Sequence, residues 1–134
     1  MNVERIERYL LALAVTYEKV SEDVWIINDP DKGLNQIVLF VDESLLTVRT
    51  KVMNYPVTDD KKSLRLFREL LQLNRDLVHG AYAIEDDYII LMDTLELETM
   101  DREELQASLD AIGLGLAEHY DRLKQFLPGH EQEA

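Results

Sequence analysis

The stretch that decides the fold runs from Asn74 to Phe126 and combines the end of one helix, a hairpin and a second, longer helix. It begins within LNRDLVHGAY at residues 73–82, continues through IEDDYIIL at residues 84–91, and reaches DREEL at residues 101–105. Acidic residues between two apolar runs are typical of a hairpin turn. None of these segments carries a known catalytic motif, so the stretch indicates a fold and not a reaction.

The hairpin and the helix that follows it have recognisable boundaries. We predict strands at Val78 to Ile84 and at Tyr88 to Leu95, joined by an acidic turn at residues 85–87. Apolar side chains occupy both sides of the second strand, so both of its faces need cover. Asp101 and Glu104 have the spacing of a capping box at the start of the last helix. The apolar stripe of that helix consists of Leu105, Leu109, Ile112, Leu116 and Leu123.

Upstream, the sequence pattern predicts a helix and then three strands. The helix is indicated by an apolar stripe at Val3, Ile6, Leu10 and Leu13. The strands are expected at Val24 to Ile27, Gln36 to Val41 and Leu45 to Met53. The strand at residues 36–41 is apolar almost throughout, which predicts a central strand covered on both faces. The strand at residues 45–53 alternates, as a half-buried antiparallel strand does.

A middle helix is expected from Leu64 to Leu73, after cap-competent residues at positions 58–60. Its apolar positions Leu64, Phe67, Leu70 and Leu71 recur at helical spacing, and Leu66 and Leu73 widen the stripe beyond one face. Two explanations stay open. The helix is wedged between the core and neighbouring loops, or part of its surface contacts another subunit.

The predicted order of elements is α-β-β-β-α-β-β-α. Strands grouped by hairpins imply an antiparallel sheet and therefore an α+β fold. The 134-residue length suits one domain, which we assign to residues 1–127, and we expect residues 128–134 to form a disordered tail.

Composition excludes several classes of function. A net charge of −13 argues against binding to nucleic acid or to an anionic membrane surface. It is compatible with a basic partner segment, or it simply keeps the protein soluble. The chain has no cysteine, which excludes disulfides and thiolate chemistry. No apolar run is long enough to cross a bilayer and no signal peptide is evident, so we expect a cytoplasmic protein.

The acidic segments do not form a convincing catalytic or metal site. The loop from Asp29 to Gly33 superficially resembles a calcium loop, but Phe40 stands where an EF-hand requires a bidentate Glu. The carboxylates of Glu85, Asp86 and Asp87 are expected to be solvated turn residues. We therefore predict no catalytic residue, no metal and no cofactor.

The histidines and two glycines also favour structural explanations. His79 and His119 have no metal-ligand spacing, and we interpret both as ordinary, partly buried histidines. Gly113 and Gly115 lie inside the predicted last helix, where glycine is unfavourable. Either the helix approaches a neighbour closely at these positions, or they form a flexible point that shifts on binding.

The order of elements and the stretch from Asn74 to Phe126 resemble the YbjN-like, type III secretion chaperone-like superfamily of the Tir chaperone type. The similar features are the helix end LLQLN at residues 70–74, the small-residue strand GAYAI at residues 80–84, the acidic turn, the apolar strand after it and the helix start at residues 101–104. This resemblance implies a small homodimeric α+β protein that holds an extended segment of another protein. It implies no catalytic motif, so no functional residue is carried over.

The leading interpretation is a non-enzymatic chaperone or adaptor that is dimeric and holds a segment of a client protein. An alternative is a regulatory or small-ligand-sensing domain of the YbjN-like type, with a pocket between helix and sheet; an unrecognised enzyme is a third option. For each candidate contact residue, a plain core position is the favoured alternative. The candidates for client binding on the sheet are Trp25, Val38, Phe40 and Tyr88, and those for self-association are Leu64, Phe67 and Leu71.

Overall fold

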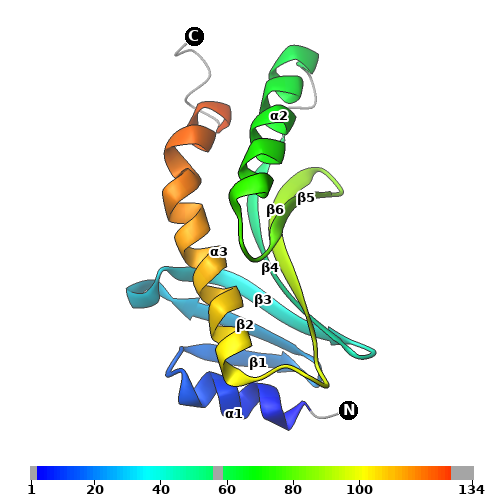
Figure 1. The fold of residues 1–134 in the computed structure, drawn as a ribbon, viewed down its shortest axis with the longest axis vertical. Helices are drawn as coiled ribbons and strands as arrows, with labels where there is room; N and C mark the ends of the chain where they lie inside the picture. Colours follow the sequence, from blue (N-terminus) through cyan, green and yellow to red (C-terminus); the bar gives the residue numbers. More distant parts are fainter. Residues whose placement is uncertain (1–2, 56–58, 128–134) are drawn as a thin grey trace.

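The computed structural model describes residues 3–55 and 59–127, which form one antiparallel sheet and its covering helices (Figure 1). The tail predicted at residues 128–134 lies outside the described residues. The strands are β1 (Tyr17–Ser21), β2 (Val24–Asp29), β3 (Leu34–Asp42), β4 (Leu45–Asn54), β5 (Ala81–Glu85) and β6 (Tyr88–Glu96). The helices are α1 (Glu4–Ala12), α2 (Asp60–Asp76) and α3 (Arg102–Leu123), with 3-10 turns η1 (Pro30–Lys32) and η2 (Lys124–Phe126). The predicted α+β class is confirmed.

The sheet has the strand order β1-β2-β3-β4-β6-β5, and every neighbouring pair is antiparallel. The predicted order of elements is confirmed apart from one strand, β1, which the sequence pattern does not indicate. Four of the five residues of β1 are exposed, so this edge strand carries no alternating apolar signal. β6 inserts between β4 and β5, which joins the N-terminal strands to the C-terminal hairpin.

Side-chain caps fix where α2 and α3 begin. The Asp59 carboxylate accepts hydrogen bonds from the backbone N–H groups of Lys61 and Lys62, both at 3.1 Å. Asp101 accepts from the Glu104 N–H at 2.8 Å, and Glu104 accepts from the Asp101 N–H at 3.3 Å. The predicted capping box is thus confirmed, and it satisfies backbone donors that a helix start leaves without partners.

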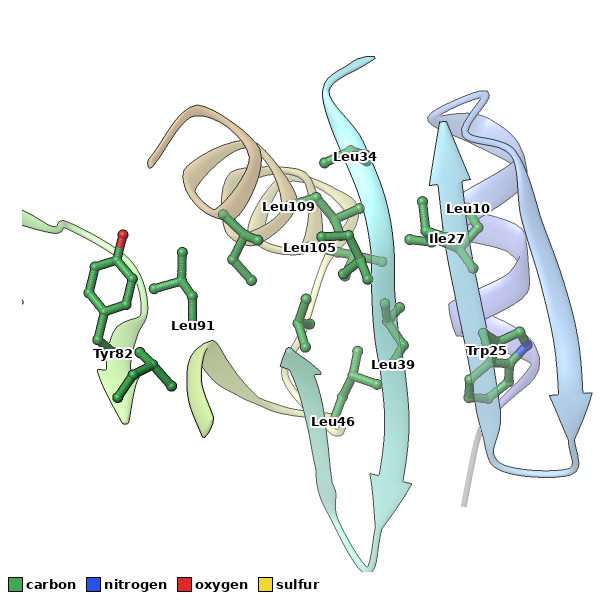
Figure 2. Packing of buried hydrophobic residues seen from close by; sticks show 14 of the residues in the cluster. Leu10, Trp25, Ile27, Leu34, Leu39, Leu46, Tyr82, Leu91, Leu105 and Leu109 are labelled. Carbon is green, nitrogen blue, oxygen red and sulfur yellow. The ribbon is translucent and has the colours of Figure 1, made fainter. Parts of the chain in front are cut away.

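All three helices pack on the same side of the sheet, and the core lies between them and the strands. Residues that pair across the strands, such as Trp25 with Leu39 and Tyr82 with Leu91, share this side and are buried. Leu105 and Leu109 of α3 reach the middle of the sheet, whereas Leu10 of α1 lies beside Ile27 of β2 (Figure 2). α2 contacts β5 at the opposite end.

The other side of the sheet has no helix over it within residues 3–55 and 59–127. Val38 and Phe40 of β3 point to this side and are only half-buried. The prediction that β3 is covered on both faces is therefore wrong. The reason is that all three helices use the opposite side, so apolar residues on this side receive no cover from a helix.

Gly113 of α3 lies close to the start of β3 and to the residue before it. A Cβ atom at this position would lie 3.0 Å from Leu34 Cδ2 and 3.2 Å from the Gly33 carbonyl oxygen. At Gly115, the nearest atom would be 3.5 Å away, which is an ordinary contact. The structure therefore favours close packing over a flexible point as the reason for glycine at position 113.

Candidate protein-binding surfaces

α2 carries apolar residues on two sides, and only one side belongs to the core. Leu66, Leu70 and Leu73 are buried against the sheet. The remaining apolar positions of the helix are Leu64, Phe67 and Leu71, which we call the α2 outer stripe. Leu64 and Leu71 are each 70% exposed, and Phe67 is half-buried with its ring 5.8 Å from the ring of Tyr55 in an edge-to-face arrangement.

Two hollows adjoin the α2 outer stripe. One, of about 420 Å³, lies along the helix and is lined by the stripe together with Arg68, Gln72 and Arg75. The other, of about 170 Å³, lies between α2 and β5 and includes Phe67, Leu71 and Ile84. Because Phe67 and Leu71 line both hollows, the apolar surface continues from the helix to the edge of the sheet.

The charge of α2 is opposite to that of the whole chain. Its residues include five basic and three acidic side chains, whereas the chain has a net charge of −13. Two of the basic residues, Arg68 and Arg75, line the larger hollow. The α2 outer stripe is therefore bordered by positive charge in an otherwise acidic protein.

The helix-free face of the sheet is the second open apolar surface. We define it by Ile26, Val38, Phe40, Tyr88 and Met92, which are all half-buried and point away from the helices. Three of the predicted client contacts, Val38, Phe40 and Tyr88, lie on this face. Their side chains come from β3 and β6, with β4 between them.

Part of the helix-free face is closed by polar side chains. Arg49 of β4 forms an ion pair with Glu85 of β5, and this pair crosses β6 at the level of Ile90. The ammonium group of Lys51 lies 4.5 Å from the ring centroid of Tyr88. These contacts explain why Ile90 is only 3% exposed on a face without a helix. They also correct the expectation that Glu85 is a fully solvated turn carboxylate.

Trp25 lies on the covered side of the sheet and not on the helix-free face. Its side chain is fully buried, and its indole N–H donates to Glu7 of α1 at 3.2 Å. Alternation along β2 directs Trp25 and Ile27 toward the helices, so Ile26 is the β2 residue on the open face. Trp25 is therefore core in this chain, and we remove it from the candidate client contacts.

Sequence reasoning missed several exposed apolar residues beside these surfaces. Ile84 is 53% exposed at the sheet edge, and Leu114 of α3 is 62% exposed. Val78, which was expected to begin a strand, lies in the loop before β5 and is 88% exposed. Alternation within β5 does not distinguish Ile84 from the buried Tyr82, because both lie on the same side of the strand.

The sequence profile of the CesT_Tir_1 family matches residues 1–128. The chain belongs to this family. Its fold is that of type III secretion chaperone-like proteins, so the family resemblance inferred from the sequence is confirmed. The sequence has no match among functionally curated proteins.

Solved structures share the fold of this CesT_Tir_1 protein at low sequence identity. YbjN from E. coli has a TM-score of 0.60 and 12% identity, covering 90% of this chain and 92% of that chain. A chain of the heterodimeric ExoU–SpcU complex from the type III secretion system of Pseudomonas aeruginosa has a TM-score of 0.59 and 16% identity, covering 92% and 98%. A chain of the HopA1–SchA chaperone–effector complex has a TM-score of 0.59 and 7% identity, covering 96% and 91%.

The CesT_Tir_1 chain also contains a buried polar pair that links β5 to α3. The Tyr82 hydroxyl oxygen and His119 Nδ1 are 2.7 Å apart, and both side chains are buried. Burial raises the pKa of Tyr82 and lowers the pKa of His119. A neutral imidazole with its proton on Nε2 accepts the hydrogen bond that the tyrosine hydroxyl donates. His119 is thus a structural histidine, whereas His79 is exposed, contrary to the expectation that it is partly buried.

Residues 3–55 and 59–127 contain no group of three or more His, Cys, Asp or Glu side chains arranged to hold a metal ion. Among the same residues, no helix is both long and apolar enough to span a bilayer.

Proposed function

We propose that this protein is a non-enzymatic, dimeric chaperone or adaptor that holds a segment of a client protein in the cytoplasm. The observation that carries the proposal is the presence of two separate apolar surfaces on one small domain. The α2 outer stripe serves self-association, and the helix-free face binds the client. Membership of the CesT_Tir_1 family and the likeness of the fold to a chain of a chaperone–effector complex support the binding of a client.

The helix-free face suits an extended client segment. Its side chains project from neighbouring antiparallel strands of one sheet, and alternate residues of an extended segment meet such a surface at similar spacing. Val38 and Phe40 supply apolar area on β3, and Tyr88 adds a ring with a polar hydroxyl. A client that covers these half-buried residues gains stability by removing their remaining apolar surface from water.

The α2 outer stripe suits a second copy of the chain. Leu64 and Leu71 are each 70% exposed, and exposed apolar side chains that lie together commonly mark a protein–protein contact. They lie beside a hollow that a side chain of the partner can fill. Contact across a two-fold axis brings the same stripe of each copy together. The two proposed surfaces use different residues, so a dimer can bind clients on both subunits.

Light scattering tests the dimer. At tens of micromolar we expect twice the monomer mass, and Leu71→Glu should give the monomer mass because it introduces a charge into the apolar contact. Leu114→Glu is the matched control, since Leu114 is 62% exposed on a different helix. A wild-type monomer under these conditions would overturn the proposed self-association.

Cross-linking in the native host tests client binding. Lys51 is exposed on the helix-free face, close to Tyr88, so a lysine-reactive cross-linker should join clients to Lys51. Phe40→Glu should abolish these cross-links, whereas Leu114→Glu should leave them unchanged. If no reproducible protein is recovered, or if Phe40→Glu recovers the same proteins in the same amounts, the chaperone proposal fails.

We propose small-ligand sensing as a second candidate function, because a cavity of about 210 Å³ lies where α1, β3 and α3 meet. Its apolar lining includes Leu34 and Leu109, and its polar lining includes Lys32 and Asp110. Opposite charges beside an apolar floor suit a small zwitterion with an apolar group.

A thermal-shift screen distinguishes this candidate, because a ligand present at about 100 times its Kd stabilises the folded state by about 2.7 kcal/mol. We expect a bound metabolite to raise the Tm of the wild type but not that of Lys32→Ala. An unchanged Tm across a broad metabolite library would overturn this second candidate.

A further inference from the structure

The sheet has two edge strands, and they differ in how well their own residues resist pairing with another strand. An edge strand exposes unpaired N–H and C=O groups, and charged side chains or bulges commonly protect it. β1 contains Glu18 and Lys19, and its pairing with β2 includes an irregularity between Lys19 and Ser21. β5 has no irregularity in its register with β6, and its only charged residue is Glu85 at its end, because AYAI at residues 81–84 is uncharged.

Asn74 of α2 occupies the exposed edge of β5. Its side-chain oxygen accepts a hydrogen bond from the backbone N–H of Tyr82 at 2.7 Å. Its side-chain N–H donates to the Tyr82 carbonyl at 3.3 Å. A carboxamide has the same donor and acceptor as a peptide group. Asn74 thus takes the position of one residue of a neighbouring strand.

The part of β5 beyond Asn74 is apolar and open. In an antiparallel ladder, backbone groups of alternate residues face the same way, so those of Ile84 face the edge as those of Tyr82 do. The Ile84 side chain is 53% exposed and lines the smaller hollow with Phe67 and Leu71. The next residue, Glu85, is engaged by Arg49 on the helix-free face.

We propose that Asn74 guards the β5 edge against antiparallel pairing with β5 of a second copy. Such pairing needs the two backbone groups of Tyr82 that Asn74 occupies, and it would bury Ile84. The α2 outer stripe continues onto this edge, so a second copy that docks on α2 comes close to β5. Asn74 therefore restricts self-association to a contact between the α2 helices. It prevents the sheets of two copies from joining into one continuous sheet. The inference concerns the regulation of the proposed dimer contact.

The test compares Asn74→Ala with Arg65→Ala, a change on the same helix at an exposed residue that lines neither hollow and has no hydrogen bond to β5 in the described part of the chain. In Asn74→Ala, the Tyr82 amide should exchange with solvent about tenfold faster under dilute conditions, since one hydrogen bond is lost. At concentrations where the wild-type dimer partly dissociates, its mean mass by light scattering should exceed that of the wild type, and the Ile84 amide should become protected. Arg65→Ala should match the wild type in all three measurements.

Two more variants keep the inference testable. Asn74→Ala combined with Ile84→Lys should return to the wild-type mass, because a charged edge residue opposes strand pairing. If Asn74→Ala does not fold, Asn74→Gln should show the same extra association, since its longer amide misses the Tyr82 backbone. A mass equal to that of the wild type, or a higher mass without protection of Ile84, would overturn the guard. A wild-type monomer overturns the proposed dimer instead, so the two failures are distinguishable.

Discussion

The two sides of α2 carry matched pairs of leucines with opposite surroundings. Leu66 and Leu73 are spaced like Leu64 and Leu71, yet the first pair is at most 1% exposed and the second is 70% exposed. The residue type, the spacing and the helix are the same, so only the position relative to the sheet differs. The first pair stabilises the fold, and the second is available for association.

Removing a buried leucine from α2 should have the largest effect on stability. We expect Leu73→Ala to lower the free energy of unfolding by about 2 to 5 kcal/mol, because it leaves a cavity against the sheet. Leu71→Ala is the matched control and should change it by less than about 0.5 kcal/mol at concentrations too low for self-association. Urea unfolding measures both, and equal losses would show that the two sides of the helix do not differ as described.

Phe67 lies between the two sides, and its truncation should have an intermediate effect. Phe67→Ala removes the edge-to-face contact with Tyr55 and part of the wall of both hollows. We expect a loss of about 1 to 2 kcal/mol in the free energy of unfolding, together with weaker self-association. Urea unfolding and light scattering on the same samples check this. A change in stability alone would assign Phe67 to the core. A change in self-association alone would assign it to the α2 outer stripe.

The N-cap of α2 stabilises the helix as a whole, and therefore both of its sides. Asp59→Ala leaves the N–H groups of Lys61 and Lys62 without their side-chain acceptor and should cost about 1 kcal/mol of folding stability. Asp60→Ala is the control, because Asp60 lies within the first turn and is not the cap. Thermal unfolding followed by circular dichroism measures both variants. A Tm for Asp59→Ala equal to that of Asp60→Ala would contradict the capping role.

His119 should give the smallest effect and a pH-dependent one. Burial lowers its pKa in the folded state; Glu118 and Asp76 oppose this shift and Arg122 adds to it. The unfolded chain therefore binds a proton first, so the stability that His119 contributes is present above about pH 6.5 and is lost as the pH falls toward the lowered pKa. We expect the stability difference between the wild type and His119→Gln to shrink between neutral pH and about pH 5.5. A difference that is independent of pH would contradict a buried neutral histidine.

The elements with strong periodic signals could be predicted from the sequence. The stripe of α3 and its Asp101 cap are local features, and local features fix a helix and its start. β1 could not be predicted in this way, because Tyr17 to Ser21 is held by pairing with β2 while its side chains face water. Backbone hydrogen bonds do not involve side chains, so the pattern of apolar residues does not indicate a strand that is held by them.

The candidate site was only partly predictable, for a related reason. Helical spacing groups Leu64 with Leu71 as well as it groups Leu66 with Leu73, and nothing local tells which pair meets the sheet. The same limit applied to Trp25, whose size and apolar ring suit a core position and a contact surface equally well. The choice depends on which side of the sheet the helices use, and that is a property of the whole chain.

The pairing of β4 with β6 has a consequence for how fast the sheet assembles. Every other pair of neighbouring strands is consecutive in the chain, whereas α2 and β5 separate β4 from β6. Hairpins form quickly because their loops are short, but this pair must close a long loop before it gains any contact. We therefore expect two rapidly formed pieces, strands β1 to β4 and the β5–β6 hairpin, whose joining limits the folding rate.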